Sequence, residues 1–167
     1  MSAEKRKQLG VLGLIIALVA VLFGGVLFVG AASGWFDHAE VTLSSEYICG
    51  EACDGELMTL DASGYEELIA AKKSFIVFVD QGGCTTADRL RGFMQDYAKE
   101  KGIKVYRMMF EQVKDSSLRE NVHYYPSVAV ISKGKVVGAL QADSDEDAGA
   151  YNDYDIFKEW IEEYLKV

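Results

Sequence analysis

Histidine and positive charge are both scarce in this sequence. Its 167 residues include 2 histidines, His38 and His123, and 17 lysines and arginines against 26 aspartates and glutamates, for a net charge of -9. Neither histidine has the spacing of a metal ligand, so we expect no metal site, and we expect no cofactor. Phosphates would repel a chain with this charge, which argues against a nucleic-acid partner.

Charged residues are absent from Gln8 to Phe36, and this long run is apolar. Residues 9–33 are long enough to cross about 30 Å of hydrocarbon as a helix, so we predict a transmembrane helix. The alternative is a cleavable signal peptide with small residues at Gly30 to Ala32, but the run exceeds the roughly 7 to 15 residues of a signal core. The basic tail, residues 1–8, should stay in the cytoplasm. The prediction is a single-pass membrane protein whose C-terminal domain is extracytoplasmic, where disulfides are permitted.

Cysteine occurs three times, at Cys49, Cys53 and Cys84. The first two lie in the motif CGEAC within residues 34–55, which we interpret as a stalk. A local structural disulfide that ties this stalk to the domain is the favoured interpretation. Two alternatives remain open: Cys49 and Cys53 form a separate redox pair, or one of them folds back to resolve an adduct at Cys84. Three cysteines allow three pairings, and the sequence does not choose among them.

Apolar residues recur with strand and helix periods from Glu56 onward. Phe75 to Val79 is a continuous apolar run that predicts a central strand buried on both faces. Ser63 and Glu66 resemble a capping box that opens a helix, and Gly102 should end a longer one. The predicted strands are 56–60, 75–79, 103–109, 127–131 and 136–140, and the predicted helices are 63–73, 86–101, 117–122 and about 156–165. The last two strands form an antiparallel hairpin, which gives a mixed sheet with helices on both faces.

The stretches ELMTLDASGYEELIAAKKSFIVFVDQGGC and YYPSVAVISKGKVVGAL, with the helix that follows the first, resemble a thioredoxin domain over residues 56–167. The resemblance implies an α/β thioredoxin-like fold, preceded here by one transmembrane helix. In that family a cis proline stands before the hairpin and faces the active-site cysteine. Pro126 is the only proline, so we expect the Tyr125–Pro126 bond to be cis, a conformation that only X-Pro bonds adopt at low cost. Tyr125 and Pro126 are therefore predicted substrate-binding residues.

The segment GGCTTADRL places Cys84 where the central strand ends and a helix begins. At a helix N-terminus, unpaired N–H groups and the dipole favour thiolate over thiol, so Cys84 is the predicted catalytic nucleophile. The hydroxyls of Thr85 and Thr86 are predicted to face the substrate as further donors. Asp88, in the first turn, is expected to oppose the thiolate electrostatically.

The chain departs from the family pattern around this cysteine. Ala87 replaces the second cysteine, giving CTTA in place of CxxC, so a mixed disulfide formed by attack cannot be resolved within the motif. Gly83 replaces the usual tryptophan, Thr85-Thr86 replaces Gly-Pro, and Phe78 stands where many members bury an acidic residue. We expect Asp80 to point to the other face of the strand and to be a poor substitute for that residue.

Two functions from different classes follow. In the first, a membrane-anchored thioredoxin-like protein uses Cys84 for thiol-disulfide exchange with exported cysteine-containing proteins or with a membrane redox partner. In the second, Cys84 is a relic, and the groove beside Pro126 pairs with an extended peptide in a non-catalytic binding or chaperone module. His123 is interpreted as a surface or packing residue rather than a base.

Overall fold

The computed structural model describes residues 40–165. The predicted cytoplasmic tail (1–8), the predicted transmembrane helix (9–33) and the first part of the predicted stalk (34–39) lie outside the described residues. Within residues 40–165, no helix is both long enough and apolar enough to cross a membrane. Anchoring and topology therefore stay predictions.

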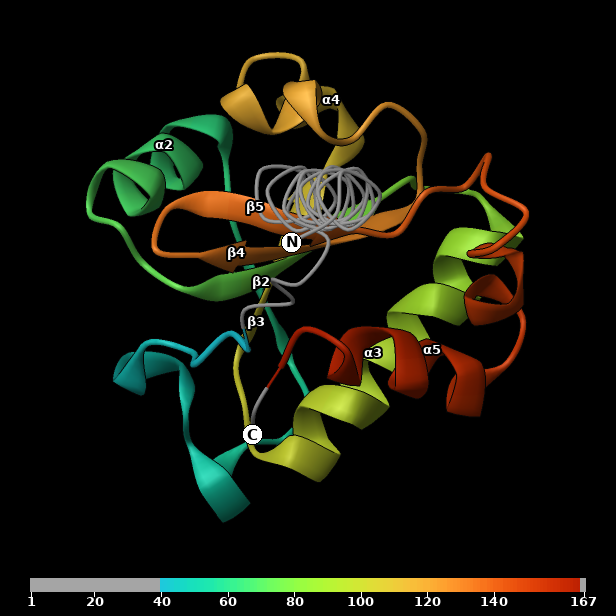
Figure 1. Cartoon of the computed structure of the whole chain (residues 1–167), viewed down its shortest axis with the longest axis horizontal. Helices are drawn as coiled ribbons and strands as arrows, with labels where there is room; N and C mark the ends of the chain where they lie inside the picture. The colour runs from blue at the N-terminus through green and yellow to red at the C-terminus, as the bar shows by residue number, and fades with distance from the viewer. Residues whose placement is uncertain (1–39, 166–167) are drawn as a thin grey trace, which may run out of the picture. The chain divides into compact units, whose positions relative to one another are not determined.

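A five-stranded mixed sheet forms the centre of the domain (Figure 1). The strand order is β1-β3-β2-β4-β5. β3 runs parallel to β1 and β2, whereas β4 runs antiparallel to β2 and β5. The strands are β1 (Leu57–Thr59), β2 (Phe75–Asp80), β3 (Val105–Met109), β4 (Ser127–Ser132) and β5 (Lys135–Ala139). This confirms the predicted mixed sheet and its antiparallel hairpin.

β2 takes the middle of the sheet because both of its faces are buried. Every residue of the strand is buried, from Phe75 to Asp80. Ile76 and Phe78 pack into one apolar cluster, and Phe75, Val77 and Val79 pack into the other. A continuous apolar run is what two covered faces require. The predicted central strand is confirmed.

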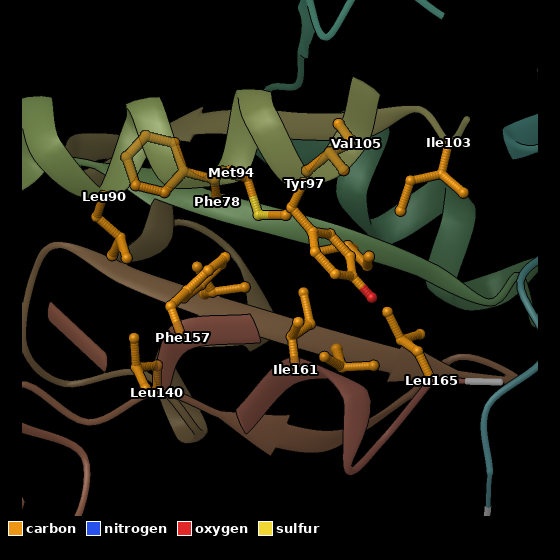
Figure 2. Packing of buried hydrophobic residues seen from close by; sticks show 14 of the residues in the cluster. Phe78, Leu90, Met94, Tyr97, Ile103, Val105, Leu140, Phe157, Ile161 and Leu165 are labelled. Carbon is orange, nitrogen blue, oxygen red and sulfur yellow. The ribbon is translucent and has the colours of Figure 1, made fainter. Parts of the chain in front are cut away.

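Helices cover both faces of the sheet, with α3 and α5 on one side and α2 and α4 on the other (Figure 1). These helices are α2 (Ala62–Ala70), α3 (Thr85–Lys101), α4 (Phe110–Val113) and α5 (Tyr154–Glu162). Figure 2 shows how α3 and α5 meet: the rings of Tyr97 and Phe157 lie edge to face, with their centroids 6.3 Å apart, beside Met94 and Ile161. This packing holds α3, and with it the residue that precedes its first turn, against the sheet.

Asp61 caps the start of α2, and Gly102 caps the end of α3. Asp61, not Ser63, caps α2, because its carboxylate accepts a hydrogen bond from Gly64 N at 2.8 Å. The predicted capping box is therefore wrong, since Ser63 already lies inside the first turn. Gly102 ends α3 in the left-handed conformation, with φ 64°, as predicted.

Residues 40–55 pack on the domain, which differs from the stalk predicted for residues 34–55. Val41 and Leu43 belong to the apolar cluster on the α3 side, and Tyr47 belongs to the other. The Tyr47 carbonyl accepts a hydrogen bond from Lys104 N at 2.8 Å. The predicted domain boundary at residue 56 was too late. Val41 and Tyr47 are buried but lie outside any strand or α-helix of the described chain, so a search for periodic segments does not detect them.

Candidate functional site

Cys84 lies at the N-cap of α3, directly after the turn that leaves β2. Gly83 has φ 74°, a conformation that favours glycine and turns the chain from strand to helix. The Cys84 carbonyl accepts a hydrogen bond from Asp88 N at 3.0 Å and so starts the helix. The side chain is half-buried and its thiol is free. As the N-cap residue, Cys84 lies next to the unpaired N–H groups of the first turn, and its side chain accepts no capping hydrogen bond.

The Tyr125–Pro126 peptide bond is cis, as predicted. Ser127, the next residue, pairs with Val79 near the carboxyl end of β2. Pro126 therefore lies at the end of the sheet where β2 finishes and the chain turns toward Cys84. The tyrosine ring packs against Phe110, with 5.6 Å between centroids. The topology thus brings the predicted cysteine and the predicted proline to the same end of the sheet.

The residues around Pro126 differ in exposure. The Pro126 carbonyl accepts a hydrogen bond from the Tyr151 hydroxyl at 3.0 Å, which fixes the backbone from behind. Tyr124 is exposed, and so is His123, which makes no hydrogen bond or ion pair within residues 40–165. The exposed tyrosine places an aromatic ring on the surface two residues before Pro126.

The two threonines that follow Cys84 point into different surroundings. Thr85 is exposed and Thr86 is half-buried. In the described part of the chain, neither hydroxyl has a hydrogen-bond partner. The predicted role as a hydrogen-bond donor to a substrate fits Thr85 better than Thr86, because the Thr85 side chain is accessible to solvent.

No second thiol lies near Cys84 in the described domain. Ala87, at the position of the second cysteine, is fully buried. Cys49 and Cys53 are joined in a disulfide whose Cα atoms are 5.5 Å apart. Cys49 N donates to the carbonyl of Gly102, at the far end of α3, and a helix of 17 residues is about 25 Å long. The interpretation in which one of these cysteines folds back to resolve an adduct at Cys84 is therefore wrong.

Asp80 is the buried charge of this region, and its predicted orientation was wrong. Residues two apart in a strand share a face, and Asp80 lies on the same side of β2 as Phe78, toward α3. Its fully buried carboxylate accepts hydrogen bonds from Arg91 on α3, at 2.9 Å, and from Arg107 Nε on β3, at 2.6 Å. Burial alone would raise the pKa of Asp80, but hydrogen bonds and the charges of both arginines together lower it. An ionised, doubly paired carboxylate does not carry protons for Cys84 at neutral pH.

Arg91 also changes the predicted effect of Asp88. Its Nη1 atom lies 2.9 Å from an Asp88 carboxylate oxygen, one turn away on the exposed side of α3. The guanidinium offsets much of the negative charge that Asp88 would otherwise present to a Cys84 thiolate. Neither arginine was predicted as part of the site; the signal in the sequence was an aspartate at the end of an apolar strand.

Comparison with known proteins settles the architecture. No protein-family model matches the sequence, and no curated protein matches it. Among solved structures, the solution structure of oxidised thioredoxin from Plasmodium falciparum superposes with a TM-score of 0.51 and 18% identity, covering 66% of this chain and 100% of that one. A single-residue mutant of thioredoxin from Halobacterium salinarum NRC-1 gives 0.50 and 15%, covering 71% and 98%. The domain has a thioredoxin fold.

Identities this low show the fold and not the activity, so the chemistry of this thioredoxin-fold domain depends on its own residues. It keeps a free cysteine at the start of α3 and a cis proline before β4. It has alanine where a dithiol motif needs its second cysteine. A single free thiol at the start of α3, at the same end of the sheet as a cis proline, is the site that the geometry offers.

Proposed function

We propose that this thioredoxin-fold protein carries out thiol-disulfide exchange as a monothiol, with Cys84 as its only attacking sulfur. The observation that carries the proposal is the position of Cys84. It is a free, half-buried thiol at the N-cap of α3, at the end of the sheet where cis Pro126 also lies. Helix N-termini favour thiolate, which is the nucleophile in disulfide exchange. Pairing of Asp88 with Arg91 offsets a charge that would oppose it.

The exchange proceeds in two balanced steps. The Cys84 thiolate attacks one sulfur of a substrate disulfide, the substrate S–S bond breaks, a Cys84–substrate disulfide forms, and the other substrate sulfur leaves as a thiolate. A second thiol, from a small molecule, a partner protein or the substrate itself, then attacks the mixed disulfide and releases Cys84. Ala87 makes this external thiol necessary. The domain therefore exchanges disulfides without holding a disulfide of its own at this site.

The substrates we propose are exported cysteine-containing proteins, or a membrane redox partner. The support is the apolar, uncharged run of residues 9–33, preceded by Lys5, Arg6 and Lys7, which by the positive-inside tendency holds the N-terminus in the cytoplasm. The disulfide between Cys49 and Cys53 suits an oxidising compartment. Thr85 and Tyr125 are proposed to contact the substrate chain next to the reacting sulfur, and Pro126, which is buried, is proposed to hold the backbone that carries Tyr125.

Alkylation of the purified full-length chain in detergent micelles tests the proposal. Intact mass after iodoacetamide treatment at pH 7 should show one modified thiol, formed faster in the folded chain than in the same chain in urea. In a separate sample that has not been alkylated, a disulfide-bearing peptide should form a mixed disulfide with the folded chain and none with Cys84→Ser. A folded-state rate at or below the urea rate, or no adduct, contradicts the proposal.

The second candidate is a non-catalytic binding module that uses the surface beside Pro126, at the same end of the sheet. One observation favours it: the position of the missing second cysteine is a fully buried alanine, so α3 has no redox partner for Cys84. Peptide binding that is unchanged in Cys84→Ser, together with a slow Cys84, would support this module.

A further inference from the structure

The Cys49–Cys53 disulfide lines a cavity at the free edge of the sheet, far from Cys84. We propose that this disulfide is a second exchange site, which reacts with the thiol of an extended peptide that pairs with the edge of β1. The cavity has a volume of about 320 Å³, and both half-buried cysteines, the whole of β1 and Lys104 line it. The proposal does not depend on Cys84.

The backbone of β1 offers unpaired groups toward this cavity. Leu60 N donates to the Arg107 carbonyl at 2.9 Å, so Leu60 and, by alternation, Met58 direct their hydrogen-bonding groups to β3. The N–H and C=O groups of Leu57 and Thr59 therefore point away from β3. Within residues 40–165 no strand pairs with that side of β1. An open strand edge is a template for one more extended chain.

The occupant that fits this edge is an extended segment with a cysteine and a basic neighbour. Ile48 precedes Cys49 and is 54% exposed, and it bridges Ile103, which lines the cavity, so it gives an apolar contact beside the disulfide. Asp54 and Glu56 are exposed carboxylates on the cavity wall, against a single cation, Lys104. Charge complementarity favours a lysine or arginine near the cysteine of the bound peptide.

The domain keeps its anchors when this disulfide opens, because the backbone around it is held independently. Cys49 N and Gly50 N both donate to the Gly102 carbonyl at 2.9 Å. Tyr47 is buried, and its ring lies 5.6 Å from that of Tyr106. The cysteines are only four residues apart, so reduction frees a short loop. Exchange can therefore be reversible.

The reaction balances without another reagent. A peptide thiolate attacks one sulfur of the Cys49–Cys53 disulfide, that S–S bond breaks, a peptide–protein disulfide forms, and the other cysteine leaves as a thiolate. If the peptide has a second thiol, its thiolate attacks the peptide sulfur. The peptide is then oxidised to a disulfide by two electrons, and Cys49 and Cys53 become thiols. Lys104, on the same wall, favours the departing thiolate.

The test uses the full-length Cys84→Ser chain, so that only this disulfide can react. The probe is an eight-residue peptide rich in valine and threonine, with one central cysteine and a lysine on each side of it. Its matched control is the same peptide N-methylated at alternate residues, which keeps the thiol but cannot add as a strand. We expect the mixed disulfide, followed by intact mass, to form about tenfold faster with the unmethylated peptide.

Two variants of β1 locate the pairing. Thr59→Pro removes an outward N–H, which an edge strand tolerates, and should lower the unmethylated peptide's rate to that of the control. Thr59→Ala keeps the N–H and should lower the rate far less than Thr59→Pro does. Equal rates for the two peptides, or an adduct that forms only when circular dichroism shows unfolding, would overturn the proposal. If Thr59→Pro does not fold, the comparison of the two peptides decides alone.

Discussion

The Asp80 carboxylate at the end of β2 accepts a hydrogen bond from Arg107 Nε on the neighbouring strand, at 2.6 Å. Arg91 on α3 binds the same carboxylate, so one buried charge joins β2, β3 and α3. Cys84 follows Asp80 by four residues. An ion-pair cluster at Asp80 therefore fixes the start of the turn that carries Cys84, in addition to apolar packing.

Asp80→Asn should destabilise the domain by roughly 2 to 3 kcal/mol, because Arg91 and Arg107 lose their charged partner. The loss should be smaller than for a fully buried ion pair, since both guanidiniums are partly exposed to water. Asp88→Asn is the matched control: it removes the other carboxylate that Arg91 binds, but that side chain is 62% exposed, so the loss should stay below about 1 kcal/mol. Urea unfolding followed by circular dichroism measures both. Equal losses would show that Asp80 is not the centre of the cluster.

Acid should remove the contribution of Asp80. The pKa of this carboxylate is lowered from its ordinary value of 3.8, so the folded chain binds fewer protons there than the unfolded chain does. The stability that it contributes is fully present above 3.8 and is lost as pH falls through the folded-state pKa. The difference in unfolding free energy between wild type and Asp80→Asn should shrink below pH 3.8. A difference that is constant from neutral pH to acid would contradict the assignment.

Ala87→Cys should convert the monothiol site into a dithiol site. Residues three apart at a helix start lie on one side, so the new thiol faces Cys84. After mild oxidation, intact mass should show no alkylatable thiol, and insulin reduction in the presence of dithiothreitol should rise by about tenfold over wild type, because the mixed disulfide now has an internal resolving thiol. Ala87→Ser has nearly the same size and should show no gain. Two free thiols after oxidation would mean that position 87 is turned away from Cys84.

Gly102→Ala should destabilise the domain by roughly 2 kcal/mol, because alanine is strained at φ 64° and its Cβ would come within 2.6 Å of Gly50 Cα. Gly92→Ala, inside α3, is the control: a Cβ there meets no atom within 4 Å, so this variant should gain about 0.5 to 1 kcal/mol. Chemical denaturation of both variants measures the contrast. A neutral Gly102→Ala would show that the segment around Cys49 moves away from α3 at little cost.

Local patterns predicted the elements that carry the site. The apolar run of β2 required two covered faces, Gly102 ended α3 in the left-handed conformation, and the single proline is cis. Each of these signals acts within a few residues, so each can be interpreted without knowledge of the fold. The cysteine at the start of α3 is placed by the same kind of signal.

Tertiary contacts decided the rest. Asp80 pairs with arginines 11 and 27 residues away, and Cys49 is held by Gly102, across more than fifty positions of the chain. A buried charge or a short irregular segment takes its partners from whichever elements fold against it, and no local propensity encodes that choice. The sequence by itself therefore determined a thioredoxin-like order of strands and helices with one cysteine at the start of α3. Only the folded chain placed the other two cysteines at the opposite end of that helix, beside the open edge of β1.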